Sequence, residues 1–181
     1  MAFSNPSTKA AGSVLTAAEW NIQVANTDFL ARPPAVCVTK STDQSVAASV
    51  NRAIAWNTEQ WDTDTMWSST RAWRFEINTA GKYRIDAHFQ WASVASANTR
   101  VAQILLNPGS STSAATGSNL LQRHVQTGIS GASMPVTLTG VYSFTSTQSV
   151  GFSVFQGTSA ALTIEHSTIQ VPRCSIMWVS S

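Results

Sequence analysis

Residues 72–91, AWRFEINTAGKYRIDAHFQW, constrain the fold of this chain more than any other stretch. In residues 73–77 and again in residues 83–91, apolar side chains alternate with polar ones, which is the period of a β-strand with one buried face. A short loop that contains Gly81 separates the two runs. This arrangement predicts a β-hairpin. We expect one face of the hairpin to pack on a core and the other to meet water or a neighbouring subunit.

The composition agrees with a β-rich domain. The chain has 181 residues, which suits one domain with a sizeable core. Apolar residues make up 43% and charged residues 11% of the chain, and Ser and Thr account for about a quarter of it. Threonine fits the pleated surface of a strand, whereas a disordered chain needs low hydrophobicity and high net charge.

Charge and hydropathy exclude two classes of partner. The net charge is +2 and the basic residues are scattered singly, so we expect no nucleic-acid partner. No stretch approaches the roughly 18 apolar residues of a membrane helix, so we expect no membrane insertion. The first twenty residues lack the apolar segment of a signal peptide. We therefore expect synthesis and retention in the cytoplasm, or release inside a particle by cell lysis.

A helix is predicted near the N-terminus, after a Ser-, Pro-, Ala- and Gly-rich arm. Thr16 is a good N-cap residue, and Glu19 three positions later completes a capping box. Leu15 before the cap and Trp20 at the fourth helical position suit a hydrophobic staple. The predicted helix runs from Ala17 to Leu30 and ends before two prolines.

The apolar residues of this helix do not form one clean stripe, so an isolated helix would be marginal. We infer that it docks on its own domain, on sister copies or on a larger assembly. Residues 1–34 are therefore interpreted as an arm with an anchoring helix, and residues 35–181 as a separate β-domain. The residues assigned to the anchor are Leu15, Thr16, Glu19, Trp20, Val24, Phe29 and Leu30.

The rest of the chain is predicted to form nine or ten strands separated by turns, a pattern that is typical of a β-sandwich. Residues 56–67 are expected to form a loop. The predicted strands cover 36–39, 45–56 (one or two short strands), the two hairpin strands, 100–106, 120–127, 134–144, 149–156, 162–166 and 169–179.

Residues 46–91 resemble the first half of a tumour-necrosis-factor/complement-q-like jelly roll. In that family a D…F segment precedes the motif F-x-(V/I)-x-x-x-G-x-Y, and the following strand ends in (L/I)-x-x-N-G. The matching residues here are Trp61 and Asp62, then Phe75, Ile77, Gly81 and Tyr83, and finally Ile104, Leu105, Leu106 and Asn107, with Pro108 standing before Gly109.

The upstream segment LTAAEWN, with its short helix and Pro-Pro break, is similar to the N-terminus of many phage structural proteins that bear such a domain. Together the two resemblances cover most of the chain. They imply an all-β jelly-roll sandwich with one short N-terminal α-helix, and a homotrimeric knob on the virion surface. The partners implied are capsid or tail proteins, bound through the N-terminal arm.

Few residues suggest catalysis. His88, His124 and His166 are far more easily explained as solvated or hydrogen-bonded side chains than as catalytic bases. No G-x-S-x-G nucleophile elbow or glycine-rich phosphate loop is present. The sequence predicts neither an enzyme nor a cofactor.

Two pairs of residues leave alternatives open. Asp62 and Asp64 suit a turn in which each carboxylate accepts backbone N–H groups, and a calcium site is the alternative. Cys37 and Cys174 are expected to be buried thiols, or a disulfide if the first and last strands pair. Two cysteines are too few for a metal site by themselves.

The chain contains seven tryptophans, and their role has three alternatives. Trp56, Trp61 and Trp67 would form a platform for carbohydrate rings, or large aromatics would fill the core, or they would fill the seam between subunits. The resemblance implies inner-sheet aromatics at a three-fold axis.

The leading hypothesis for the function is a capsid-decoration, head-fibre or tail-associated knob. The alternative is an adhesin that binds host glycans through tryptophans or through loops 107–119, 128–134 and 157–161. The candidate interface or platform residues are Trp56, Trp61, Trp67, Trp73, Tyr83, Phe89 and Trp91.

Overall fold

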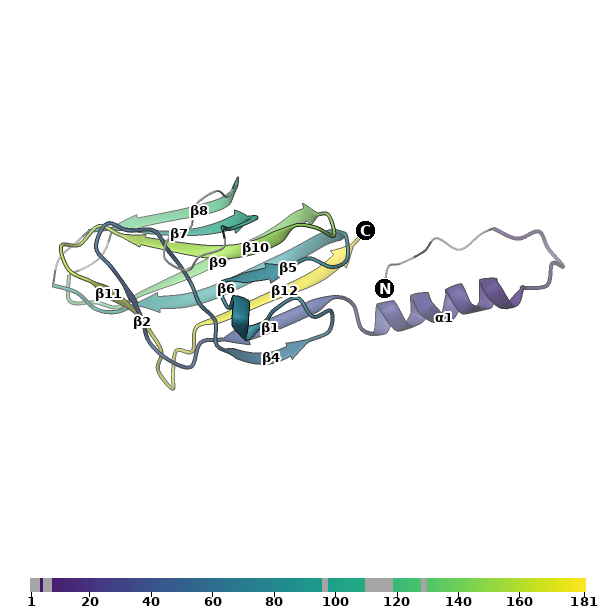
Figure 1. The fold of residues 1–181 in the computed structure, drawn as a ribbon, viewed down its shortest axis with the longest axis horizontal. Coiled ribbons are helices and arrows are strands. Elements are labelled where there is room, and N and C mark those ends of the chain that lie inside the picture. The colour runs from purple at the N-terminus through teal and green to yellow at the C-terminus, as the bar shows by residue number, and fades with distance from the viewer. Residues whose placement is uncertain (1–3, 5–7, 96–97, 110–118, 128–129) are drawn as a thin grey trace.

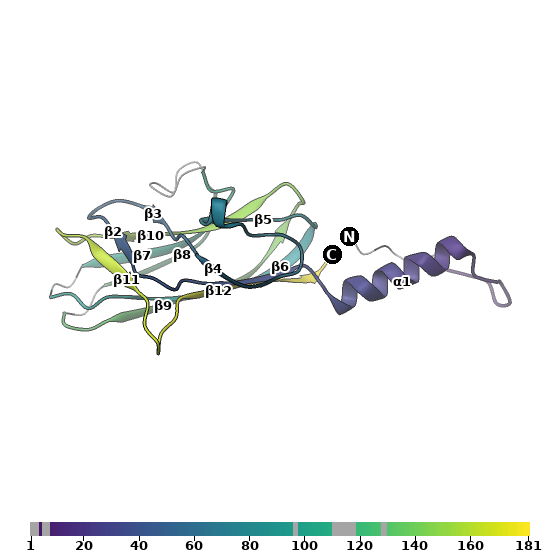
Figure 2. The same cartoon turned by 60° about the horizontal axis from the view of Figure 1, so that its bottom comes forward.

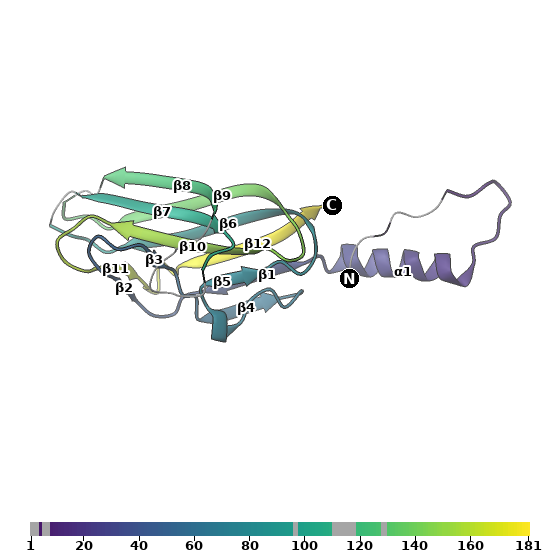
Figure 3. The same cartoon turned by 45° about the horizontal axis from the view of Figure 1, so that its top comes forward.

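A computed structural model describes residues 4, 8–95, 98–109, 119–127 and 130–181. Twelve strands form two antiparallel sheets that pack face to face, and a single helix projects from one end of this sandwich (Figure 1). Figures 2 and 3 show from two other sides that the helix lies outside the sandwich. The predicted β-sandwich with one N-terminal helix is confirmed.

The larger sheet has seven strands arranged around β6 (Gly81–Trp91). Strand β9 (Met134–Phe144) pairs along the whole of β6 on one side. On the other side, β6 pairs first with β12 and, near Trp91, with β11. The remaining order is β12 (Arg173–Ser180), β1 (Ala35–Thr39) and β4 (Thr58–Asp62) in one direction, and β11 (Leu162–Glu165) and β2 (Gln44–Val46) in the other.

The smaller sheet has five strands, and β10 (Ser149–Gln156) pairs with three of them. Strand β7 (Thr99–Leu106) lies along one side of β10 and pairs in turn with β8 (Asn119–Thr127). The short strands β3 (Arg52–Ala53) and β5 (Arg74–Glu76) share the other side of β10. A one-turn 3₁₀ helix, η1 (Ser69–Arg71), precedes β5.

The predicted hairpin is wrong, although both of its strands exist. Strand β5 belongs to the five-stranded sheet and β6 to the seven-stranded sheet, so the two strands face each other across the core instead of pairing. The Ile77 N–H donates to the Gln148 carbonyl at 2.8 Å, which keeps the chain on the smaller sheet until the crossing. Alternation reports which face of a strand is buried, but it does not report which strand is its neighbour.

A single apolar cluster fills the space between the sheets. Phe152 of β10 lies at the centre of an aromatic group, with edge-to-face contacts to Trp56 at 5.9 Å and to Phe75 at 6.1 Å between ring centroids. From the other sheet, Tyr83 and Ile85 of β6 are fully buried. The two sheets therefore share one core. One face of the seven-stranded sheet packs on this core, and its opposite face points away from it.

Two predicted boundaries differ from the structure. Residues 58–62, expected as loop, form β4 at the edge of the larger sheet, where backbone pairing to β1 outweighs a sequence without strand periodicity. The last strand begins at Arg173 instead of 169, directly after Pro172, which has no N–H for a sheet hydrogen bond. Within the described residues, no helix has the length and apolar character needed to cross a membrane.

Candidate interaction surfaces

The N-terminal helix, α1 (Ala17–Ala31), begins as predicted. The Thr16 hydroxyl oxygen accepts from the Glu19 N–H at 3.3 Å, and the Glu19 carboxylate accepts from the Thr16 N–H at 2.9 Å. This reciprocal pair is the predicted capping box, and it satisfies N–H groups that would otherwise lack partners. At the other end, the Arg32 N–H donates to the Asp28 carbonyl at 3.0 Å.

Of the large apolar side chains of α1, only Phe29 is buried, with 4% exposure. It packs edge to face on Trp178 of β12, with ring centroids 4.8 Å apart. Trp20 and Leu30 are each 60% exposed and Val24 is 45% exposed. Leu15, before the cap, is also half exposed, at 50%. The helix therefore joins the sandwich near its C-terminal end and leaves most of its apolar surface uncovered.

Two described residues of the N-terminal arm, Ser4 and Lys9, contact α1. The Asn26 side chain accepts from the Ser4 N–H at 2.9 Å and donates to the Ser4 carbonyl at 2.6 Å. The Lys9 ammonium and the Glu19 carboxylate form an ion pair at 2.5 Å. Asn26 is buried by this contact, whereas Trp20 and Val24 stay exposed. The described arm residues therefore contact the side of α1 that carries Glu19 and Asn26.

A hollow of about 250 Å³ lies where α1 meets the sandwich, and Asp28, Arg32 and Asp64 line it together with Phe29. Burial raises the pKa of the Asp64 carboxyl, and a hydrogen bond with Thr79 offsets part of this effect. Oδ2 of Asp64 is buried and makes no hydrogen bond with the described residues. Nearby, Tyr83 donates to the Thr79 carbonyl at 2.6 Å, and burial raises the pKa of its phenol.

The outward face of the seven-stranded sheet combines one ion pair with exposed apolar side chains. On β6, Arg84 Nε and Asp86 Oδ2 lie 2.7 Å apart, and Thr139 of β9 donates to Asp86 Oδ1 at 2.6 Å. Burial alone would raise the pKa of the Asp86 carboxyl, but the hydrogen bonds from Thr139 and Arg84 and the charge of Arg84 lower it. In the register, Val141 and Met177 flank Arg84 on either side.

These two side chains are well exposed for apolar residues. Val141 is 57% and Met177 is 43% exposed. They lie on strands that bury their alternate residues in the core. This face therefore carries exposed apolar side chains beside one hydrogen-bonded ion pair, and exposed apolar area is what a contact with another molecule would bury.

A second hollow, of about 460 Å³, lies on the same sheet and includes Trp61, Gln60 and Arg173 in its lining. Trp61 of β4 is 37% exposed. Beneath this region the Cys37 thiol is completely buried, and Arg173 Nε lies 3.1 Å from its sulfur. An exposed indole beside an amide and a guanidinium can stack on a sugar ring or on a side chain of another subunit.

The structure separates the seven predicted aromatic residues into two groups. Five of them are core residues with at most 8% exposure, so the core alternative holds for them, and neither a platform nor a seam can include them without unfolding. Only Trp61 and the half-buried Trp73 reach the surface. The five core residues are Trp56, Trp67, Tyr83, Phe89 and Trp91.

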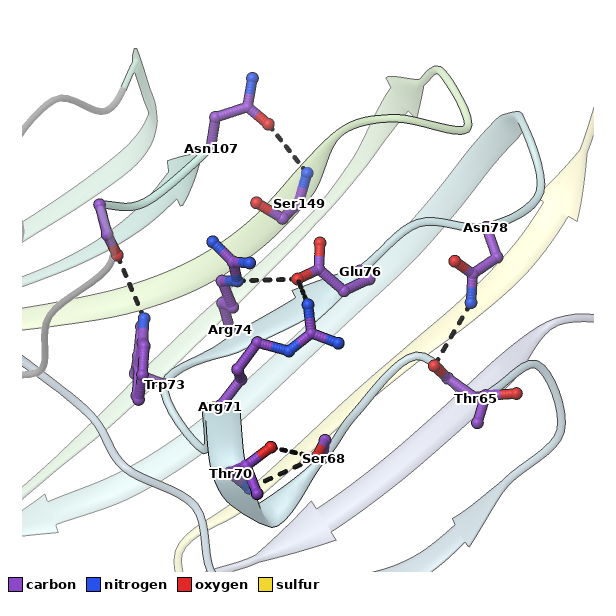
Figure 4. A network of polar contacts seen from close by, with 11 residues as sticks. Thr65, Ser68, Thr70, Arg71, Trp73, Arg74, Glu76, Asn78, Asn107 and Ser149 are labelled. Carbon is purple, nitrogen blue, oxygen red and sulfur yellow. Dashed lines mark hydrogen bonds and ion pairs between the residues drawn. The ribbon is translucent and has the colours of Figure 1, made fainter.

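Trp73 belongs to a polar network at the entrance to β5 (Figure 4). Its indole N–H donates to the Gly109 carbonyl at 3.1 Å. The Glu76 carboxylate lies 2.8 Å from both Arg71 Nη1 and Arg74 Nε. These contacts hold Trp73 against the loop after β7, so its position is explained by local structure. Residues 110–118 of the predicted glycan loops, and 128–129, lie outside the described residues.

The proposed turn at Asp62 is present. Asp62 Oδ1 accepts from the Asp64 N–H at 3.1 Å and Oδ2 accepts from the Trp67 N–H at 2.8 Å. Both carboxylate oxygens of Asp62 are therefore used by the backbone, as the turn alternative expects. Asp64 departs from that alternative, because its Oδ2 has no hydrogen-bond partner among the described residues. Across the part of the chain that the structure describes, no cluster of three His, Cys, Asp or Glu side chains is arranged to hold a metal.

The two cysteines do not form a disulfide. Strands β1 and β12 pair, as the disulfide alternative requires, but Cys37 lies opposite Ser175 and Cys174 opposite Val38. Neighbouring positions on a strand point to opposite faces, so the thiols lie on opposite sides of the sheet. Burial raises the pKa of the Cys174 thiol well above its ordinary value.

The three histidines are spread over the sandwich. His88 is half-buried on the outward face of β6, opposite Arg173 and Thr137 in the register. A ring nitrogen of His124 lies 2.9 Å from the Gln126 side-chain oxygen. The His166 backbone N–H donates to Asp43 at 2.7 Å. They belong to separate strands or loops and do not converge on one site.

Comparison with solved structures places this strand arrangement in a known fold. The Eiger TNF of S. frugiperda is 9% identical with a TM-score of 0.59, over 82% of this chain and 94% of that chain. Murine APRIL, crystallised at pH 5.0, is 10% identical with a TM-score of 0.58, over 81% and 98%. The globular domain of zebrafish complement 1qA is 12% identical with a TM-score of 0.57, over 81% and 97%.

The chain has the TNF/complement-q jelly-roll fold. This agrees with the resemblance seen in residues 46–91. No protein-family model matches the sequence, and a search of curated proteins finds no match. At such low identity the likeness concerns the fold alone, because one fold hosts many functions.

Proposed function

We propose that this chain is a non-enzymatic structural protein that forms a homotrimer of jelly-roll knobs and is anchored by α1 to the surface of a phage particle. The observation that carries the proposal is the exposed apolar surface of α1, where Trp20 and Leu30 are each 60% exposed and Val24 is 45% exposed. Large apolar side chains that stay exposed on a projecting helix favour a contact with another molecule. The resemblance of the segment LTAAEWN to phage structural proteins supports a virion as that molecule.

The outward face of the seven-stranded sheet supports trimerisation. Val141 and Met177 are exposed on either side of Arg84, which forms an ion pair with Asp86. The strand arrangement is the one that the resemblance associates with a three-fold axis. A trimer would bury these apolar side chains and leave the hydroxyl-rich remainder in water.

Light scattering on the full chain tests the trimer. The wild-type protein should have three times the chain mass of 19.4 kDa. Val141→Asp places a charge on the proposed seam and should shift the mass towards the monomer without loss of β-sheet circular dichroism. The matched control is Val125→Asp, because Val125 is 54% exposed but lies on the smaller sheet. A monomeric wild type, or an equal effect of the two substitutions, would contradict the proposal.

A second candidate function, a glycan-binding adhesin, is favoured by the hollow beside Trp61. An exposed indole next to Gln60 and Arg173 offers a stacking surface together with hydrogen-bond donors, as carbohydrate recognition requires. A glycan array on the full chain separates the two functions. A pure structural protein should show no selective binding, whereas an adhesin should bind a related set of glycans.

A further inference from the structure

Arg100, near the start of β7, is fully buried, with 0% exposure. Its alternate neighbours Ala102 and Ile104 belong to the apolar core, so its side chain points between the sheets. Nε, Nη1 and Nη2 of Arg100 make no hydrogen bond with the described residues. A guanidinium has five N–H donors and keeps its charge at neutral pH, so a buried one without partners is strongly unfavourable.

The chain itself has no carboxylate side chain to neutralise this charge. All nine Asp and Glu residues lie in the described ranges, and none of their ion pairs involves Arg100. Burial lowers the pKa of the Arg100 guanidinium and no nearby charge opposes this effect, yet its ordinary value is so high that it stays protonated. None of the ion pairs of the described residues therefore supplies a counter-charge for Arg100.

Neighbouring strands add a further donor at the same place. Arg100 lies directly opposite Gln156 of β10 and Gln126 of β8 in the register, so the three side chains share one face. Nε2 of Gln126 is buried and has no hydrogen-bond partner among the described residues. Oε1 of Gln126 is already 2.9 Å from His124, and Oε1 of Gln156 accepts from the Thr158 N–H at 2.7 Å.

The facing sheet contributes a third donor at this end. Trp91, the last residue of β6, is fully buried, and its indole Nε1 makes no hydrogen bond with the described residues. β6 ends and β7 begins at the end of the sandwich that lies away from α1 (Figure 1). Unpartnered atoms on Arg100, Gln126 and Trp91 are all nitrogen donors. Water could accept from them, but water would leave the positive charge uncompensated.

We propose that Arg100, with Gln126 beside it, binds a small oxyanion in the interior of the sandwich, at the end remote from the helix. A guanidinium matches a carboxylate, sulfate or phosphate through two parallel N–H···O bonds, and the Gln126 amide would donate to the same ion. The complete burial of Arg100 selects a small ion over a carboxylate on another protein chain. The inference is independent of the trimer and of the anchor.

Thermal unfolding of the full chain tests this site. The protein is dialysed into chloride, and phosphate, sulfate or acetate is added at constant ionic strength. Binding to the folded state raises the unfolding midpoint as the anion concentration passes its dissociation constant. Arg100→Met keeps the length of the side chain and removes the charge, so it should abolish the anion-specific rise. Arg123→Met, an exposed arginine on β8, should behave as the wild type and corrects for general salt effects.

A tightly held ion would survive dialysis and mask the rise in midpoint. The dialysed protein is therefore also denatured, and the released anions are measured by ion chromatography. An equimolar oxyanion from the wild type supports the site, and its loss in Arg100→Met assigns it. If Arg100→Met does not fold, Gln126→Leu replaces it and should weaken the anion response. The proposal is overturned if the wild type shows neither an anion-specific rise nor a released oxyanion, or if a folded Arg100→Met responds like the wild type.

Discussion

Phe29 of α1 and Trp178 of β12 meet edge to face, with ring centroids 4.8 Å apart and ring planes at 88°. This contact links the N-terminal helix to the C-terminal strand, because Phe29 is the one large apolar side chain of α1 that is buried. This ring contact is one of the described contacts at the junction of the helix and the sandwich, beside the hydrogen bond from the Trp178 N–H to the Pro34 carbonyl at 2.8 Å.

Removal of the Phe29 ring should release the helix. Phe29→Ala loses an aromatic pair worth about 0.5–1.5 kcal/mol beyond the apolar area that it buries. Hydrogen exchange should become faster in the amides of α1 and stay unchanged in β6 and β12. Trp20→Ala is the matched control, because Trp20 is 60% exposed and should leave the exchange rates of α1 near their wild-type values. Equal acceleration in both variants would mean that the contact with Trp178 does not hold the helix.

The two thiols provide a prediction about the sheet. Cys37 and Cys174 are both completely buried, and burial raises the pKa of Cys174, so its reactive thiolate is scarce. Ellman's reagent should detect no thiol in the folded protein and two thiols per chain after denaturation without a reductant. Detection of none after denaturation would indicate a disulfide and a different register of β1 against β12.

The Asp64 carboxyl predicts a pH effect on stability. Burial raises its pKa in the folded state, so the folded protein binds this proton more tightly than the unfolded chain does. Stability therefore falls as the pH rises from the unfolded pKa of about 3.9 through the folded pKa. Above that range the folded protein keeps a buried charge whose Oδ2 has no hydrogen-bond partner among the described residues.

Asp64→Asn should therefore raise the unfolding midpoint at pH 7, and the gain should disappear below about pH 3.9, where both states are protonated in the wild type. The control is Glu59→Gln, which removes an exposed carboxylate from β4 and should leave the midpoint unchanged at both pH values. Scanning calorimetry at several pH values measures both variants. A gain of equal size at every pH would exclude the ionised carboxylate as its cause.

The sequence predicted most elements because their signals are local. The capping box at Thr16 and Glu19 identified the start of α1, and alternation over 134–144 identified β9 to the residue. Strand pairing is not a local property. The sequence pattern therefore predicts β5 and β6 as one hairpin, although the two strands belong to different sheets. A four-residue link between two amphipathic strands is compatible with both arrangements, and only packing across the core distinguishes them.

The candidate surfaces were harder to predict because composition does not report burial. Trp56 and Trp61 occur five residues apart in one segment, yet Trp56 is fully buried and Trp61 is 37% exposed. The buried charge of Arg100, by contrast, can be predicted from the sequence pattern. Arg100 occupies the same face as Ala102 and Ile104 in a predicted strand, so a charged residue among core positions was visible in the sequence.

Trp61→Ala distinguishes the seam from the glycan site. If Trp61 packs against a neighbouring subunit, its removal should cost at least about 2 kcal/mol of association free energy, roughly a thirtyfold rise in the dissociation constant. Sedimentation equilibrium should then show monomers at concentrations where the wild type is a trimer, while Trp20→Ala, on the helix, should leave the trimer intact. If Trp61→Ala remains a stable trimer and loses selective binding on a glycan array, the hollow beside Arg173 is a carbohydrate site and the adhesin function replaces the structural one.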